Sequence, residues 1–373
     1  VTGTGSSLTM KGNVTVSGSS VTGIVANGTT VKLEDDATVK VNNNGAVAGE
    51  IDKKGSYGIV VKGATGKFEG TGTTADVKVT TDKSIGLYSE GTLTVKKANV
   101  TATEGAINFF AKNGTININN GGTTETGQKS LLFYTSNNGT VKLTGGTMNA
   151  TIKGGTDPSN RGTAFYYEAP GATYGTFDDT AIQTYANNTF GGTLGKLHLN
   201  METGSRLFVA SNVSMNLTNT RPTGISTALG LGGLTGSGYK TFMLYLSELV
   251  VNQAVDLNDA NSPYNQLEIA NSSIKNADTI TGTNNRQVAM AQENGNDTSG
   301  NGYAASKVTL TNTATGTINL SGDESTGIYA KRGIVYNDGT ISVGKKSTAI
   351  YLVDDGLGPA SAPGASISNN GTI

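Results

Sequence analysis

A short phrase that recurs at nearly constant spacing constrains the fold more than any other feature of the 373-residue chain. Asn-Gly-Thr, or a close variant of it, is followed by apolar residues two and four places after the glycine. The glycines of this phrase are Gly91, Gly114, Gly139, Gly316, Gly339 and Gly371, with weaker matches at Gly45 and Gly66. Alternation of this kind predicts a β-strand with one buried face.

The spacing of these glycines indicates a structural period. Within each run of copies the period is about 21–25 residues, which is in the range of solenoid repeats. The longer gap before Gly371 contains a turn-rich insert at 354–362. A second phrase falls between the first ones, and each period therefore contains at least two short strands. Its copies are Ser56-Tyr-Gly-Ile-Val60, Ser84-Ile-Gly-Leu-Tyr88, Ser325-Thr-Gly-Ile-Tyr329 and Ser347-Thr-Ala-Ile-Tyr351.

Serial repeats of two or three strands predict an all-β fold, the right-handed parallel β-helix. One coil cannot bury its inward residues alone, so neighbouring coils stack around a continuous core. Asn and Thr at equivalent turns are expected to form hydrogen-bonded ladders along the stack. The β-propeller, the competing architecture, is disfavoured because its repeat needs about 40–45 residues.

The composition agrees with short strands and tight turns. The chain contains 53 Gly, 55 Thr and 37 Asn, residue types that disfavour helix interiors and suit strands or turns. A flexible linker is excluded because 35% of the residues are apolar and are spaced along the chain. Collagen is excluded because no Gly-X-Y register exists.

The repeat divides the chain into three segments. We predict β-helix coils in 1–150, an irregular, insertion-bearing part of the same β-helix in 151–305, and further coils in 306–373. One short helix is expected in 239–257, where Phe242, Leu246 and Leu249 have the spacing of a helix face. A pair of buried strands is the alternative for this stretch.

Aromatic residues gather in the irregular part, with seven between Ala164 and Phe190. Such rings either form the small core of an insertion or bind a ligand or partner. Acidic residues lie among them and could meet cationic ligands, including free arginine. The candidate binding residues are Tyr166, Tyr167, Glu168, Tyr174, Phe177, Asp178 and Asp179.

Charge and reactive residues argue against several functions. Lys plus Arg number 27 and Asp plus Glu number 28, so the basic excess of a nucleic-acid-binding protein is absent. The chain has no Cys and a single His, His198, in an alternating strand pattern. We therefore predict no enzyme activity, no catalytic or metal-binding residues and no cofactor.

A β-helical polysaccharide-degrading enzyme remains an alternative. Pectate lyases and related enzymes combine this fold with acidic clusters and Ca²⁺. The Asp pairs here are 35–36, 178–179 and 354–355. Neighbouring residues on a strand point to opposite faces, so solvated turns are the favoured interpretation, and Asp178-Asp179 is the best enzymatic candidate because it lies beside the aromatics.

Two regions resemble a known family. The segments 324–330 and 337–344 resemble the passenger repeats of large bacterial type V autotransporters, and Thr241–Leu249 is similar to the fusobacterial branch of these adhesins. The resemblance implies that the chain is an excerpt of a longer protein, with a signal peptide upstream and a membrane-embedded β-barrel downstream.

The resemblance also implies a location and a role. Passengers of this family are displayed on the surface of Gram-negative cells, where they contribute to virulence by attachment. The expected partner is a protein or glycan receptor on host cells or other bacteria, with no nucleic acid and no membrane contact apart from the barrel. The alternative within the family is a passive stalk that presents a binding tip located elsewhere.

Overall fold

The computed structural model describes residues 2–3, 5–34, 36–45, 56–80, 84–171, 173–217, 224–293, 308–354 and 365–373, with only the backbone of 43–45. The described residues form two compact units. Unit 1 comprises Val1–Tyr167, Ile182–Phe208 and Ser226–Lys240, and unit 2 comprises Glu168–Ala181, Val209–Ile225 and Thr241–Ile373. Each unit is described by itself.

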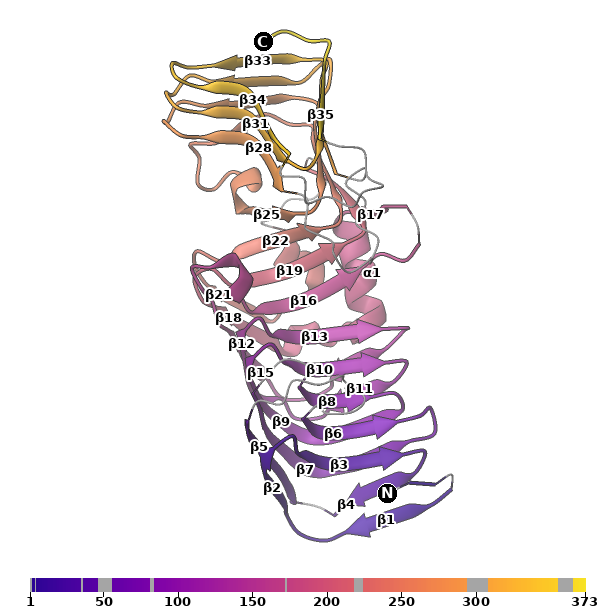
Figure 1. The fold of residues 1–373 in the computed structure, drawn as a ribbon. Coiled ribbons are helices and arrows are strands. Elements are labelled where there is room, and N and C mark those ends of the chain that lie inside the picture. The colour runs from indigo at the N-terminus through magenta and orange to yellow at the C-terminus, as the bar shows by residue number, and fades with distance from the viewer. Residues whose placement is uncertain are drawn as a thin grey trace. The chain divides into compact units, whose positions relative to one another are not determined.

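The fold is a parallel β-helix, as the repeat predicts. In unit 1 one strand from each coil joins sheet 1, and the rest of the coil joins sheet 2 (Figure 1). Sheet 1 has nine strands, and those of unit 1 include β3 (Thr22–Asn27), β6 (Tyr57–Lys62), β8 (Ile85–Ser89), β10 (Ile107–Lys112), β13 (Leu131–Ser136) and β16 (Thr163–Glu168).

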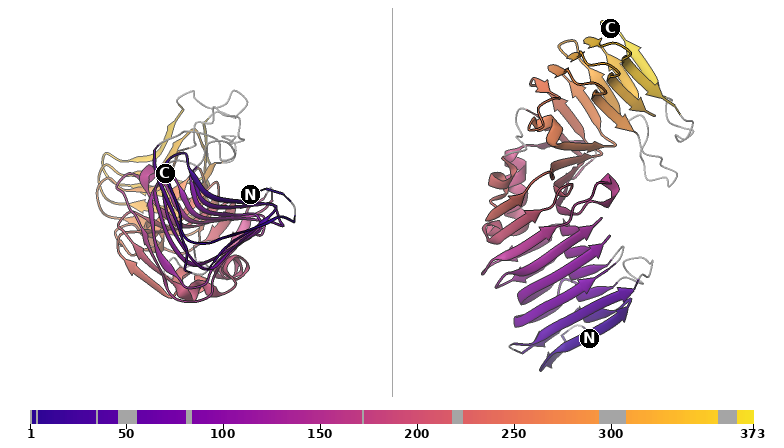
Figure 2. Two further views of the ribbon diagram at one scale, coloured as in Figure 1. Left: turned by 90° about the horizontal axis from the view of Figure 1, so that it is seen from below. Right: turned by 90° about the vertical axis from the view of Figure 1, so that its left-hand side faces the viewer.

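Sheet 2 contains shorter strands and two long ones. Its strands are β1 (Ser7–Met10), β2 (Val14–Ser19), β4 (Thr30–Leu33), β5 (Thr38–Gly45), β7 (Lys67–Val79), β9 (Thr92–Glu104), β11 (Thr115–Ile118), β12 (Gly122–Gln128), β14 (Thr140–Leu143), β15 (Met148–Ile152), β18 (Leu197–Met201) and β21 (Gly233–Gly236). The end-on view in Figure 2 shows the strands of unit 1 overlying one another from coil to coil.

The predicted period is confirmed by the strand register. Thr92 pairs with Thr115, and Thr115 in turn pairs with Thr140. Each of these threonines directly follows the glycine of the first phrase, so the phrase occupies the same place in successive coils. The hydroxyl groups of Thr115 and Thr140 lie 2.9 Å apart.

The glycines of the two phrases allow close approach between coils. A Cβ atom on Gly114 would lie 2.7 Å from the carbonyl oxygen of Gly91, which is closer than van der Waals contact allows. A Cβ atom on Gly86, in the second phrase, would lie 2.4 Å from Cγ1 of Val100 and 2.6 Å from the carbonyl oxygen of Asn108. Glycine is thus needed at these positions because the neighbouring coil occupies the space of a side chain.

The core of unit 1 contains a stack of phenylalanine rings, one from each of four coils. The ring centroids of Phe109 and Phe133 are 5.4 Å apart, Phe165 follows at 5.7 Å, and Phe208 at a further 6.0 Å. All four side chains are fully buried. The stack supplies the large apolar area that a chain rich in Gly and Thr otherwise lacks.

In the irregular region, β15 and β18 of unit 1 are joined by a long stretch of chain, of which Glu168–Ala181 belongs to unit 2. Met148 of β15 pairs with Leu197 of β18, although the two strands are separated by far more chain than one period. Between them lie the 3₁₀-helices η1 (Pro158–Asn160) and η2 (Thr193–Lys196) and the helix α1 (Asp179–Phe190). A second short helix, α2, spans Ile225–Leu229. The insertion is therefore built into a coil of the β-helix.

Unit 2 contains three further sheets with the same parallel order (Figure 1). Sheet 3 contains β17 (Gly175–Phe177), β20 (Val213–Asn216), β23 (Glu248–Val251), β26 (Ser273–Asn276), β29 (Thr309–Asn312), β32 (Ile334–Asn337) and β35 (Ser366–Asn369). Sheet 4 contains β24 (Val255–Asp256), β27 (Thr279–Gly282), β30 (Thr317–Leu320) and β33 (Thr340–Val343). Sheet 5 contains β28 (Val288–Glu293), β31 (Thr326–Lys331) and β34 (Thr348–Val353). The remaining elements are β19 (Arg206–Ser211), β22 (Lys240–Tyr245), β25 (Leu267–Ala270) and η3 (Pro263–Gln266).

An asparagine ladder runs along unit 2, as predicted from the repeat. Asn276 donates from Nδ2 to Oδ1 of Asn312 at 2.9 Å, and Asn312 donates to Asn337 at 2.8 Å. Asn337 continues the ladder to Asn369 at 2.6 Å. Asn276, Asn312 and Asn337 are completely buried, so these amides satisfy one another at the ends of sheet 3.

The helix expected in 239–257 is wrong, and the alternative of two strands is right. Phe242 and Leu244 of β22 are fully buried, while Met243 between them and Tyr245 after them are partly exposed. Leu246 then adopts a left-handed backbone with φ of 53° and separates β22 from β23. The spacing of Phe242, Leu246 and Leu249 thus arises from two strands of period two that flank a turn.

Candidate functional site

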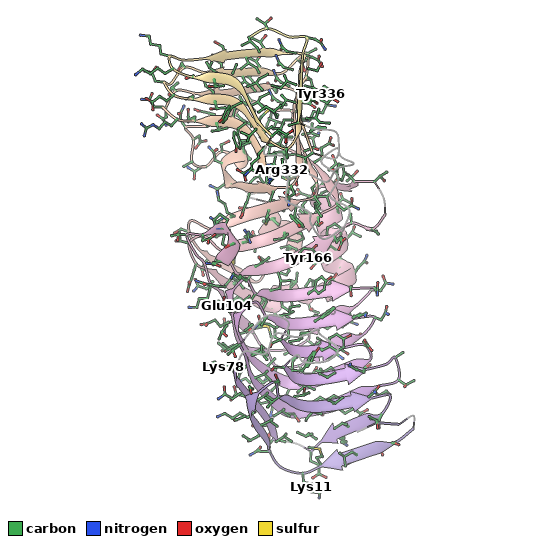
Figure 3. All side chains as sticks on the ribbon, viewed as in Figure 1. Lys11, Lys78, Glu104, Tyr166, Arg332 and Tyr336 are labelled. Carbon is green, nitrogen blue, oxygen red and sulfur yellow. The ribbon has the colours of Figure 1, made fainter. Side chains whose placement is uncertain are left out.

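An outer aromatic row crosses sheet 1 of unit 1. It consists of Tyr88, Phe110, Tyr134 and Tyr166, one from each of four successive coils. The ring centroids are 5.2, 4.7 and 5.6 Å apart along this order, and Tyr57 lies 6.4 Å from Tyr88. Figure 3 labels Tyr166 among the side chains of this sheet. The phenylalanine stack occupies the opposite face, and the row belongs to a second hydrophobic cluster that buries Tyr88 and Phe110.

The accessibility of the row changes along its length. Tyr88 is 6% exposed and Phe110 is 7% exposed, and they pack with Val60 and Ile85. Tyr134 and Tyr166 are half-buried. These two tyrosines therefore offer ring surface to a ligand, while Tyr88 and Phe110 fix the position of the row.

A carboxylate lies at the buried end of the row. Glu90 accepts a hydrogen bond from the Tyr88 hydroxyl at 2.5 Å and another from the backbone N–H of Gly63 at 2.9 Å. Partial burial of Glu90 opposes ionisation, but these hydrogen bonds and the charges of Lys112 and Lys62 outweigh it and lower the pKa. Glu90 is thus held as an anion that orients the Tyr88 ring.

Tyr167, the second predicted binding residue, has a different environment from Tyr166. Its ring packs edge-on against Tyr185 of α1 at 5.4 Å, and burial raises its pKa. Tyr185 is buried and also contacts Phe190 and Phe208. The alternative that the aromatics form an insertion core is therefore correct for Tyr185 and Phe190, while Tyr166 belongs to the outer row.

The other predicted residues lie in unit 2 and have individual structural contacts. Phe177 is buried against Phe242, with ring centroids 5.6 Å apart. Tyr174 is 37% exposed and hydrogen-bonds Ser273, and burial of the remainder raises its pKa. Glu168 is exposed at the end of β16.

The Asp178-Asp179 pair begins a helix. Asp178 accepts a hydrogen bond at Oδ1 from the backbone N–H of Ala181 at 2.9 Å, and Asp179 is the first residue of α1. This geometry is a helix N-cap, in which a side chain satisfies a free backbone donor. Asp178 thus has a structural role that the sequence pattern did not indicate.

The groups considered for catalysis are distributed without clustering. Among the residues that the structure describes, no three His, Asp or Glu side chains gather as a metal site would require. His198 is exposed on β18, an ordinary strand position as predicted. The Asp pairs at 35–36 and 354–355 fall partly outside the described residues.

Of the outer row, only Tyr166 was predicted from the sequence as a binding residue. The second phrase contains the signal, because its fifth residue is Tyr88 in one copy and the same strand position is Phe110, Tyr134 and Tyr166 in the next coils. In this phrase the third residue is Gly and the fourth residue is buried. The fifth residue therefore lies on the outer face.

Comparisons with known proteins leave the chain without an assigned family. No family model, no curated protein and no solved structure matches it. Within the described residues, no helix combines the length and apolar character needed to cross a bilayer.

Proposed function

We propose that the chain is a segment of a bacterial surface adhesin, a passenger of the autotransporter type, that attaches its cell to host cells or to other bacteria. The outer aromatic row is the observation that carries this proposal. Two of its rings, Tyr134 and Tyr166, are half-buried on the face of sheet 1 opposite the phenylalanine stack, so they offer surface that the core of the β-helix does not use. Large rings that do not serve the core are typical of binding surfaces.

The architecture suits display at a cell surface. Each coil contacts its neighbours through backbone hydrogen bonds and ladders, so the scaffold is rigid and presents side chains from many coils in register. The absence of Cys agrees with an export route in which the chain crosses a membrane largely unfolded. The partner is a protein or glycan receptor, and the chain acts by binding, with no enzymatic step.

A competition experiment tests the proposal. Cells that display this chain are allowed to attach to epithelial cells or to partner bacteria in the presence of the purified chain. An adhesin segment in solution should occupy the receptor and reduce attachment as its concentration rises. The Tyr166→Ala variant should compete less well, with an unchanged circular dichroism spectrum.

The competition experiment and a separate glycan assay distinguish the alternatives. A passive stalk has no receptor, so attachment that is unaffected by the purified chain at every concentration would contradict the proposal. A polysaccharide-degrading enzyme would release new reducing ends from a glycan panel, with or without Ca²⁺, and such release would favour the enzymatic alternative.

A further inference from the structure

A second aromatic pair occupies the same position of the repeat in unit 2. Tyr329 of β31 and Tyr351 of β34 are the fifth residues of two copies of the second phrase and pair in register. Their ring centroids are 5.8 Å apart, with the planes inclined by 39°. Tyr351 is 53% exposed, one of the most exposed large apolar side chains that the structure describes.

The core does not require aromatic rings at these positions. Ile328 and Ala330, on either side of Tyr329, are the buried residues of β31. Gly327 faces inward, since a Cβ atom there would meet Cγ2 of Ile341 at 2.9 Å. The aromatic residue at the fifth position thus recurs in both units. Tyr88 packs in a buried cluster of unit 1, whereas Tyr329 and Tyr351 of unit 2 lie on the outer face and are not needed by the core.

The surroundings of the pair are polar and carry both signs of charge. The Tyr329 hydroxyl donates to Oε1 of Glu293 at 3.2 Å, and Glu293 is the last residue of the adjacent strand β28. Lys331 follows Tyr329 on the outer face, and Thr348 is exposed on β34. Two apolar residues share this face, Ala291 as the register partner of Tyr329 and Val353 two places after Tyr351. A protein-binding hot spot is typically enclosed by apolar groups that exclude water, whereas this pair also borders the polar and charged groups named above.

We propose that Tyr329, Tyr351 and Glu293 form a subsite for a neutral polysaccharide whose chain runs across successive coils. This inference rests on the proposed function and names the ligand class. A pyranose ring has an apolar C–H face, which stacks on an aromatic ring, and a rim of hydroxyl groups, which donate to a carboxylate.

The geometry matches an extended sugar chain. Neighbouring coils are separated by the inter-strand distance of about 4.8 Å, which is comparable with the length of one pyranose unit in an extended chain. Two successive sugars can therefore stack on Tyr351 and Tyr329. An anionic polysaccharide is disfavoured because the Glu293 carboxylate lies at the subsite and repels a second negative charge.

Isothermal titration calorimetry on the purified chain tests the subsite. Three probes are neutral oligosaccharides: cellohexaose, laminarihexaose and chitohexaose. A heparin-derived hexasaccharide is the anionic probe. Saturable binding of at least one neutral hexaose is expected, with none of the heparin fragment. Tyr351→Ala should raise the Kd about tenfold, the change that loss of one stacked ring produces.

Two further variants distinguish stacking from a general surface effect. Tyr351→Phe keeps the ring and should keep the affinity. Tyr336→Ala removes an exposed tyrosine of sheet 3, 41% exposed, and should bind as the unaltered chain does. Circular dichroism checks that each variant is folded.

The outcomes separate this inference from the proposed function. Absence of binding to all three neutral hexaoses, preferred binding of the heparin fragment, or unchanged affinity of Tyr351→Ala would each overturn the subsite. The attachment competition contains no added sugar. If the purified chain still competes for attachment but binds no neutral hexaose, only the subsite proposal is contradicted. If the purified chain does not compete for attachment, the adhesin proposal is contradicted.

Discussion

Tyr134 and Tyr166 lie one coil apart on the outside of unit 1, with ring centroids 5.6 Å apart. The next residue, Tyr167, has its ring against Tyr185 of α1. Two adjacent tyrosines of one strand thus belong to different environments, the outer aromatic row and the insertion core. Alternation along a strand separates them, and their substitution should have different consequences.

Single substitutions of these two tyrosines are therefore informative. Tyr166→Ala should weaken cell attachment and change the free energy of unfolding by less than about 0.5 kcal/mol, as for a surface position. Tyr167→Ala should lower the free energy of unfolding by about 1–3 kcal/mol because it opens a gap beside Tyr185. Urea unfolding followed by circular dichroism and an attachment assay measure the two effects. Full attachment by a folded Tyr166→Ala variant would remove the outer row from the proposed function.

The asparagine ladder should contribute strongly to the stability of unit 2. Asn312 both accepts from Asn276 and donates to Asn337 in a buried position. Asn312→Ala removes the acceptor at 2.9 Å from Asn276 Nδ2 and the donor to Asn337 Oδ1, at a cost of about 1–3 kcal/mol for each group left unsatisfied. The free energy of unfolding in urea measures the loss.

A matched control for the ladder is available on the same unit. Asn319→Ala removes an exposed asparagine of β30 and should change stability by less than about 0.5 kcal/mol. If the Asn312 and Asn319 variants unfolded at the same urea concentration, the buried ladder would not be a source of stability in unit 2.

Repeat spacing and alternation were sufficient to predict the β-helix and its period, because each strand has one buried face and a nearly constant coil length. The helix in 239–257 was mispredicted because strand positions on either side of Leu246 produce a helix-like spacing. The helix α1 was missed, although residues 179–190 lack Gly and Pro and follow a capping Asp178.

The candidate site was only partly predictable for a different reason. A cluster of aromatic residues in sequence identified Tyr166, but the rings that accompany it in space come from other coils, about one period apart. Proximity along the chain instead suggested Phe177 and Asp178, which the fold uses for packing and for capping. In a solenoid, neighbours in space are found one repeat away in the sequence.

The glycine of the second phrase should resist substitution. Gly86→Ala places a methyl group 2.4 Å from Cγ1 of Val100 and 2.6 Å from the carbonyl oxygen of Asn108, and overpacking of this kind costs about 1–3 kcal/mol. Gly195→Ala is the control in unit 1, because its Cβ atom would meet only the carbonyl oxygen of Gly230 at 3.8 Å. Thermal unfolding should show a lower midpoint for the Gly86 variant alone; equal midpoints would mean that the coils can separate to admit a side chain.

Alkaline pH should destabilise the protein through two tyrosines, Tyr185, which is buried, and Tyr264, which is half-buried. Burial raises the pKa of Tyr185 and of Tyr264 far above the unfolded value of 10.0. The folded protein keeps both phenols neutral, so this contribution to stability is fully present below pH 10 and is lost as the pH rises towards the folded pKa values. Each phenol should lower the free energy of unfolding by about 1.4 kcal/mol per pH unit above 10.

Urea unfolding at pH 8 and pH 11 measures this loss of stability. A double variant, Tyr185→Phe with Tyr264→Phe, cannot ionise at these two positions and should lose less stability over the same pH range. An equal loss in the double variant would assign alkaline unfolding to other groups.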